Sequence, residues 1–377
     1  MSVEIRKVQT KGELKEFIHF ANDLYKGDEY YAPSLISDDY NTFDPKKNGA
    51  FDFCQAQMFL AYKDGKIAGR VMAIINNRAN ETWKVKQVRY GWIDFINDEE
   101  VAKALLDAVA AWGKERGMTD IAGPLGFTDF DPEGMLVEGF ERVATMIGIY
   151  NYPYYPQILE KLGYTKETDW MEYRITIPDE LPERYYKYAD IVIAKNKLNV
   201  RKVTRRMINK ENYGRKFFKL INETYYKLYG FSLLSDKQID AYTKLYLGLL
   251  DTRMVSFIEN EKGELVAAGV TMPDLTAALQ KCGGKLFPFG WFRLLKAIFW
   301  KPCDTLDMLL VGVREDYRGK GLNAVLVTDL YPRLKVMGFK YAETTAELET
   351  NDSIQAMWKY FEREQHKRRR VYAKKIE

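Results

Sequence analysis

The chain carries the same order of expected elements twice. In each half, a strand is followed by helices, a hairpin, a strand, a helix, a strand, a second helix and a closing strand. The two hairpins, 56–75 and 254–272, are pairs of apolar runs, and their turns contain Gly65 and Gly263. A repeated unit of this size predicts an α+β protein of two tandem domains, each a mixed, mostly antiparallel sheet flanked by helices.

The expected boundary between the two units is rich in proline. Pro178 and Pro182 interrupt the regular apolar pattern in "IPDELPERYY". A chain of 377 residues is also long for a single hydrophobic core. We therefore expect one domain at 1–180 and the other at 181–377.

Composition and charge narrow the class of protein. A net charge of +4 over 377 residues is far below that of a dedicated nucleic-acid binder, so no DNA partner is expected. The three cysteines and two histidines show no metal-ligand spacing and no catalytic relay, so no metal site is predicted. The first residues are charged throughout, so we expect neither a signal peptide nor a membrane span there, and a cytoplasmic location.

One segment is more apolar than its surroundings. Residues 286–300, "LFPFGWFRLLKAIFW", are too short and too charged to cross a bilayer because Arg293 and Lys296 interrupt them. As a helix, this segment would either lie in a membrane interface, cover a lipidic substrate or pack on its own domain. The residues alone leave these interpretations open.

The stretch 314–323, "REDYRGKGLN", joins an apolar strand pattern to an apolar helix pattern. The N-terminus of a helix presents free N–H groups and a partial positive charge, and glycines let the backbone approach an anion closely. This arrangement is suited to pyrophosphate. Two glycines also occur in purely structural turns, so the residues alone are consistent with either role.

The run "MLLVGVREDYRGKGLNAVLV" closely resembles the coenzyme A loop of the GNAT acyltransferase superfamily. The superfamily pattern of Gln or Arg, two residues, Gly, one residue and a final Gly or Ala falls on Arg318, Gly321 and Asn323, and Asn323 departs from it. The resemblance implies acetyl-CoA or another acyl-CoA as cosubstrate, with pantetheine along the preceding strand. The residues that it implies for cofactor binding are Val311, Val313, Arg318, Gly319, Lys320, Gly321, Leu322, Asn323 and Ser353.

The resemblance also implies catalytic residues. The expected helix 353–364 contains "SIQAMWKY", which is similar to the Asn-x-x-Ala-x-x-x-Tyr pattern of the superfamily with serine replacing asparagine. It places Tyr360 where a phenol protonates the departing thiolate, although an aromatic residue on a helix is also a normal core residue. Some members have a basic glutamate twelve residues earlier. Here that position is Leu348, and its neighbours Glu347 and Glu349 are the candidates, unless both are solvated strand residues.

The first half lacks the corresponding loop. Residues 94–106, "DFINDEEVAKALL", contain no glycine, and their acidic side chains would repel a pyrophosphate. Leu159 stands where the superfamily tyrosine belongs. We interpret 1–180 as a degenerate copy with a structural or acceptor-pocket role.

Acidic and aromatic residues converge in the first half between 126 and 156. Carboxylates would receive a cationic amine, and tyrosines would enclose it. An acidic surface loop is the alternative interpretation. The candidate substrate-binding residues are Asp129, Asp131, Glu133, Tyr154 and Tyr155.

We therefore predict an N-acyltransferase in which the amine of a small molecule or peptide attacks an acyl-CoA thioester directly in the second half. Two alternatives stay open. One is an aminoacyl-tRNA-dependent transferase of the same superfold, to which the basic runs 201–206 and 366–370 are relevant. The other is a non-catalytic protein that binds acyl-CoA or a protein partner.

Overall fold

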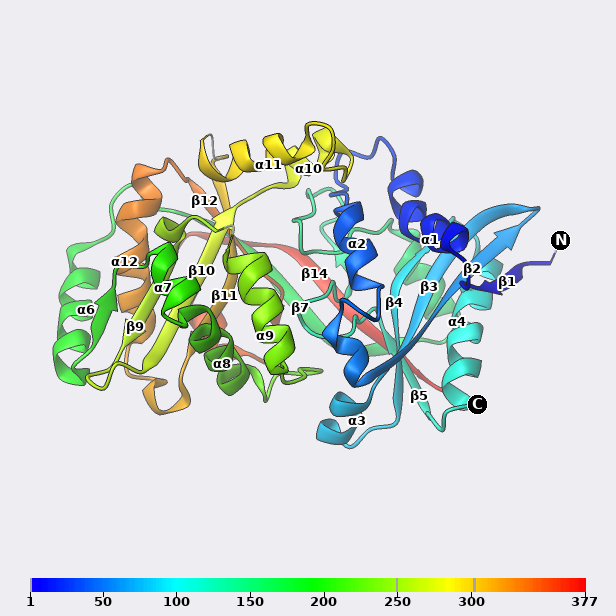
Figure 1. The fold of residues 1–377 in the computed structure, drawn as a ribbon, viewed down its shortest axis with the longest axis horizontal. Coiled ribbons are helices and arrows are strands. Elements are labelled where there is room, and N and C mark those ends of the chain that lie inside the picture. Colours follow the sequence, from blue (N-terminus) through cyan, green and yellow to red (C-terminus); the bar gives the residue numbers. More distant parts are fainter. Residues whose placement is uncertain (1, 249, 301–302) are drawn as a thin grey trace.

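The structure is a computed structural model that describes residues 2–248, 250–300 and 303–377. The first half of the chain forms a sheet with helices packed on it (Figure 1). Its elements in chain order are β1 (Glu4–Lys7), α1 (Lys11–Leu24), α2 (Ile36–Thr42), β2 (Cys54–Lys63), β3 (Lys66–Asn76), α3 (Asn77–Trp83), β4 (Gln87–Phe95), α4 (Glu99–Lys114), β5 (Asp120–Gly123), β6 (Met135–Glu138), α5 (Tyr154–Lys161) and β7 (Thr165–Thr176).

The second half repeats this order, with α6 added before its first strand, a third helix before its hairpin, and α10 and α11 in the place of α3. Its elements are α6 (Glu183–Asn196), β8 (Asn199–Arg201), α7 (Arg205–Lys210), α8 (Tyr213–Tyr225), α9 (Asp236–Tyr242), β9 (Val255–Glu259), β10 (Leu265–Pro273), α10 (Thr276–Cys282), α11 (Gly290–Phe299), β11 (Thr305–Val313), α12 (Leu322–Val336), β12 (Tyr341–Thr344), β13 (Glu347–Leu348), α13 (Asp352–Gln355) and β14 (Arg363–Lys375). The predicted hairpins are confirmed in position.

In the part of the chain that the structure describes, the two halves share one fourteen-stranded sheet because they exchange their closing strands. The order is β1-β2-β3-β4-β5-β14-β7-β12-β11-β10-β9-β8, with β13 paired to β7 and β6 to β14. Strand β7 ends the first half but pairs with β12 of the second, and β14 ends the chain but pairs with β5 of the first. Both strands run through the middle of the molecule (Figure 1). The division at 180 stays a prediction, and the sheet crosses it.

Each half has its own hydrophobic core. In the first half, α4 buries Val101, Leu105 and Val109 against the sheet, because these residues recur on one face at helical spacing. In the second half, α8 buries Phe217 and Ile221 in the same way. The helices therefore fix the strands from which the candidate site is built.

One sequence-based expectation is wrong here. The helix expected over 353–364 is a single turn, Asp352–Gln355, followed by a 3₁₀ turn, Ala356–Trp358, and the strand β14 begins at Arg363. The expected helix overlaps β14 only at Arg363 and Glu364, where pairing with β7 prevails over helix formation.

Candidate active site

Strands β11 and β12 separate in the middle of the second half. They pair in parallel from Thr305 with Tyr341 to Met308 with Thr344. Beyond this point β11 continues to Val313 along β10 only, while the β12 side breaks at residues 345–346 before β13. Beyond Met308, the edge of β11 that faces away from β10 therefore has no neighbouring strand among the described residues.

Tyr225, at the end of α8, shows which backbone groups face this gap. Its hydroxyl donates to the carbonyl oxygen of Val311 at 3.0 Å and accepts from the amide of Val311 at 3.4 Å. These are the polar groups that the resemblance implies for pantetheine. The sequence analysis did not identify Tyr225, because its contact with Val311 joins residues 86 positions apart.

The glycine loop between β11 and α12 is exposed and unfilled. Gly319 and Gly321 both have positive φ, +72° and +87°, and nothing lies within 4 Å of the position that a Cβ atom would take at Gly319. A Cβ at Gly321 would lie 2.6 Å from the hydroxyl of Tyr188 on α6, so α6 supports the other side of the loop. Glycine is therefore required at position 321, because φ is positive there and because a Cβ atom would clash with Tyr188.

Backbone amides at this loop lack partners. Among the described residues, the amides of Gly319, Gly321, Leu322 and Asn323 form no hydrogen bond with the protein. Lys320 is exposed beside them. Arg318 instead donates to the carbonyl oxygen of Thr224 at 2.8 Å and so anchors the loop to the end of α8. The free amides and the lysine fit a diphosphate.

The two candidate glutamates have different surroundings. Glu347 on β13 is 7% exposed and accepts a hydrogen bond from the indole nitrogen of Trp358 at 2.8 Å. Burial raises the pKa of Glu347 to about 7. Its other oxygen, Oε2, has no partner in the described part of the chain. Glu349 forms an ion pair with Lys166 at 2.7 Å, which gives it a structural role on the surface of β7.

Tyr360 and Ser353 lie outside this buried region. Tyr360 is 75% exposed and follows the 3₁₀ turn that ends at Trp358. Ser353 is exposed on α13. The structure therefore brings Glu347 and Tyr225 to the separated strands, whereas the roles of Tyr360 and Ser353 stay predictions.

Acidic residues of the first half face the same region. The Asp129 carboxylate accepts from the amide of Ser232, in the segment after α8, at 3.2 Å. Burial raises the pKa of Asp129 and that of Asp131 to about 6, and it raises the pKa of Glu133 well above its usual value. Burial and the negative charges of Glu347 and Asp129 together raise the pKa of Tyr225 to about 12. Carboxylates from both halves therefore surround Tyr225.

Arg89 carries a positive charge close to these acidic residues. It donates to the carbonyl oxygens of Gly126 at 3.1 Å and Gly230 at 2.9 Å, so it joins the acidic loop to the segment that follows α8. Its charge lowers the pKa of Asp129 and of Glu133 against the effect of burial. No sequence pattern points to Arg89, which lies near the start of β4 and meets its partners only through the fold.

In the first half, side chains fill the equivalent gap between β4 and β5. These strands pair only from Gln87 to Arg89. The Tyr154 hydroxyl donates to the carbonyl oxygen of Phe95 at 2.7 Å, and the Tyr155 hydroxyl accepts from its amide at 3.0 Å. Tyr155 is a core residue. Tyr154 and Tyr155, predicted to bind substrate, thus occupy backbone groups of β4 themselves.

The N-terminus of α4 is also occupied by the chain. Asp98 accepts hydrogen bonds from the amides of Glu100 at 3.0 Å and Val101 at 3.3 Å. It also forms an ion pair with Lys63 at 2.5 Å. A carboxylate of the protein therefore satisfies the donors that are free in the second half.

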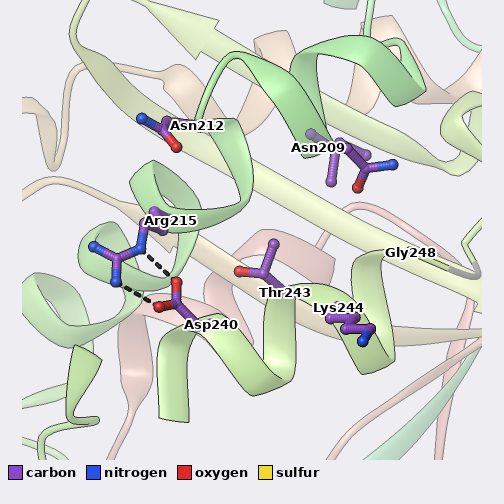
Figure 2. A pocket seen from close by; sticks show the side chains of 8 residues that line it. Asn209, Asn212, Arg215, Asp240, Thr243, Lys244 and Gly248 are labelled. Carbon is purple, nitrogen blue, oxygen red and sulfur yellow. Dashed lines mark hydrogen bonds and ion pairs between the residues drawn. The ribbon is translucent and has the colours of Figure 1, made fainter. Parts of the chain in front are cut away.

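Two surface hollows differ in their relation to this site. One of about 270 Å³ lies between the halves, next to the candidate site, and is lined by Trp83, Lys227, Leu228, Tyr229, Leu348, Thr350 and Asn351. Another of about 440 Å³ lies among α7, α8 and α9, where Arg215 pairs with Asp240 (Figure 2). None of the predicted site residues lines the second hollow.

None of the described helices is long and apolar enough to cross a membrane. The described residues contain no group of three or more histidine, cysteine, aspartate or glutamate side chains arranged to hold a metal ion.

The chain was compared with known proteins. No family model matches it. It is 28% identical over 383 residues to Protein YghO of Escherichia coli K12, with 99% of this chain and 95% of that protein covered. It is 25% identical over 377 residues to the bacterial ceramide synthase of Caulobacter vibrioides, covering 98% and 96%.

Solved structures show the same architecture. A tandem GNAT protein from the clavulanic acid biosynthesis pathway aligns with a TM-score of 0.56 and 10% identity, over 100% of this chain and 99% of that one. The GCN5-related glucosamine N-acetyltransferase region of a fungal multi-domain β-N-acetylglucosaminidase aligns with a TM-score of 0.57 and 13% identity, over 99% of this chain and 38% of that one. The chain has the tandem GNAT fold.

Proposed function

We propose that this protein is an N-acyltransferase that uses an acyl-CoA donor in its second half. The contrast between the two halves is the observation that carries the proposal. In the second half, the amides of the glycine loop are free, whereas in the first half Asp98 accepts from the amides at the corresponding place. The strand backbone is hydrogen-bonded to tyrosine in both halves, to Tyr225 in the second and to Tyr154 and Tyr155 in the first. One donor site per chain follows.

Glu347 is the group best placed to accept a proton. An amine that attacks a thioester carbonyl must first be neutral, and a base with a pKa near neutrality is suited to this step. The amine nitrogen then forms a bond to the carbonyl carbon, the carbon–sulfur bond breaks, and the thiolate receives a proton. The amide of Val311 would stabilise the developing oxyanion once a ligand displaces the Tyr225 hydroxyl.

The proposed acceptor is the amine of a long-chain lipid. The relative named bacterial ceramide synthase matches nearly the whole chain, and ceramide is the amide of a long-chain amino alcohol. The carboxyl groups of Asp129 and Glu347, which both act on Tyr225, suit an ammonium group in their ionised form, and the ammonium group would lose its proton before attack. A direct assay compares sphinganine with a short, water-soluble amine as acceptor, with release of free CoA thiol as the readout.

The donor site is tested by acyl-CoA binding. Isothermal titration with acetyl-CoA or palmitoyl-CoA is expected to show one site per chain. Lys320→Glu should weaken binding roughly tenfold, because it replaces a cation with an anion beside the free amides. Asp98→Ala, at the equivalent place in the first half, is the matched control and should leave affinity unchanged. Two sites per chain, or a loss of affinity in Asp98→Ala alone, would contradict the proposal.

Two tyrosines are candidates for the residue that protonates the departing thiolate. Tyr225 contacts β11 itself, whereas Tyr360 is the residue implied by resemblance and is exposed. We expect Tyr360→Phe to lower kcat by about tenfold if its loop closes over the bound donor, with acyl-CoA affinity retained. Pre-steady-state thiol release measures this. An unchanged kcat in Tyr360→Phe, together with a reduced kcat in Tyr225→Phe, would assign the proton to Tyr225.

A further inference from the structure

The helix α11 and the segment before it form an exposed aromatic surface at the edge of the molecule where the two halves meet (Figure 1). Phe287 is 79% exposed, Phe289 69% and Trp300 67%, and Trp291 and Phe292 are about half exposed. Soluble surfaces seldom carry so many neighbouring aromatic side chains without a partner. This set, Phe287, Phe289, Trp291, Phe292 and Trp300, is called the aromatic surface below.

Helix α11 is anchored to the hydrophobic core of the second half. Leu294 and Ile298 bury one side of α11 in the core of the second half and so fix the helix. Phe292 is exposed on the other side, and Phe287, Phe289 and Trp300 are exposed beyond the two ends of α11. The amide of Ile36 in the first half donates to the carbonyl oxygen of Gly284 at 3.1 Å, and Gln280 donates to the carbonyl oxygen of Tyr31 at 3.0 Å. The surface is therefore a rigid feature supported by both halves.

The charge of this region has a single sign. Between Asp274 and Asp304 the chain contains no acidic residue and five basic ones, Lys281, Lys285, Arg293, Lys296 and Lys301. Lys281, Lys285, Arg293 and Lys296 are exposed among the aromatic side chains. Aromatic residues prefer the boundary between lipid headgroups and acyl chains, and lysine and arginine bind anionic headgroups. This combination is complementary to an anionic bilayer surface.

The aromatic surface also lies close in the chain to the donor strand. Helix α11 ends at Phe299, and β11, which carries Val311, begins at Thr305. Leu309 and Leu310 of β11 pack against the hydrophobic core that contains Leu294 and Ile298. Helix α11 and the separated strand β11 therefore rest on the same core.

We propose that the aromatic surface docks the protein on the surface of an anionic phospholipid bilayer, with α11 lying in the plane of the interface. The proposed delivery of a lipid amine from that bilayer rests on the proposed function, whereas the docking itself does not. A helix of this kind inserts its aromatic side chains among the headgroups and does not cross the membrane.

Vesicle flotation tests the docking without any catalytic step. The wild-type protein should float with vesicles of phosphatidylglycerol and phosphatidylcholine in equal parts, and much less with phosphatidylcholine alone. F287S/F289S should reduce the bound fraction about tenfold. I191S/V85S removes two exposed apolar residues, on α6 and just after α3, away from α11 in Figure 1, and is the matched control that should bind like the wild type. K285Q/K296Q should no longer bind the anionic vesicles, and its thermal unfolding midpoint should stay that of the wild type.

Three results would overturn the proposal. They are no flotation of the wild type, equal flotation of F287S/F289S and the wild type, and equal binding to the neutral and the anionic vesicles. Sedimentation velocity adds a fourth: a wild-type dimer that becomes monomeric in F287S/F289S would assign the aromatic surface to a second copy of the chain. Turnover of a short, soluble amine should be unchanged in F287S/F289S, so a failure of docking is distinguishable from a failure of the proposed chemistry.

Discussion

Replacing Glu347 by glutamine is expected to lower kcat by about 10²- to 10⁴-fold, because the amide side chain cannot accept the proton of the attacking amine. The substitution keeps the shape of the side chain and the hydrogen bond from Trp358. Binding of acyl-CoA should therefore persist, since Glu347 is separate from the glycine loop. Steady-state thiol release gives kcat, and titration calorimetry gives the affinity. Glu349→Gln, whose side chain pairs with Lys166 at the surface, is the control and should remain close to wild type.

Because the Glu347 carboxyl loses its proton as pH rises, activity and stability are expected to depend on pH in opposite directions. The deprotonated form is the base, so kcat/KM should rise with pH up to a plateau above about 7. The raised pKa means that the folded protein keeps a proton that the unfolded chain releases between 4.5 and about 7. The free energy of unfolding therefore falls as pH rises through that window.

In Glu347→Gln, both dependences should be lost. The variant should be more stable than the wild type above pH 7 and similar to it below 4.5, which urea denaturation at the two conditions measures. A variant that is inactive and also less stable throughout would show that Glu347 acts through the structure. An inactive but stabilised variant supports the role of a buried base.

The local features of the fold were predictable from sequence because they depend on neighbouring residues. The hairpin turn at Gly65 follows from a short-range pattern. The loop at Gly321 follows from a short sequence motif, and in the structure this glycine has a φ of +87°. In the first half, acidic residues in place of glycines predicted that the loop does not bind an anion, and the hydrogen bonds of Asp98 give a physical reason for that prediction.

The exchange of closing strands was not predictable in the same way. Strands β7 and β14 each have the length and composition of the last strand of their own half, and no local signal says which neighbour they pair with. Tyr225 and Arg89 were missed for the same reason, since their contacts join distant parts of the chain. Burial separates Glu347 from Glu349, although both lie in one strand pattern.

The exchanged strands carry buried charges that hold the two halves together. Arg369 on β14 is 1% exposed and donates to Glu172 of β7 and to the carbonyl oxygen of Ile149. Lys367 lies 3.4 Å from the other oxygen of Glu172. Burial alone would raise the pKa of Glu172, but the positive charges of Arg369 and Lys367 prevail and hold it at about 2.

Arg369→Met is therefore expected to lower the free energy of unfolding by about 3–5 kcal/mol, because it leaves a buried carboxylate short of one cation. Lys375 lies on the same strand as Arg369 and forms an exposed ion pair with Asp120 of β5. Lys375→Met should therefore lower the free energy of unfolding by less than about 1 kcal/mol. The depressed pKa of Glu172 stabilises the wild type above 4.5, and this contribution disappears as pH falls toward 2. The difference between wild type and Arg369→Met should shrink over that range. Urea denaturation at each pH measures it, and a loss below 1 kcal/mol at neutral pH would show that the exchanged strands do not depend on this pair.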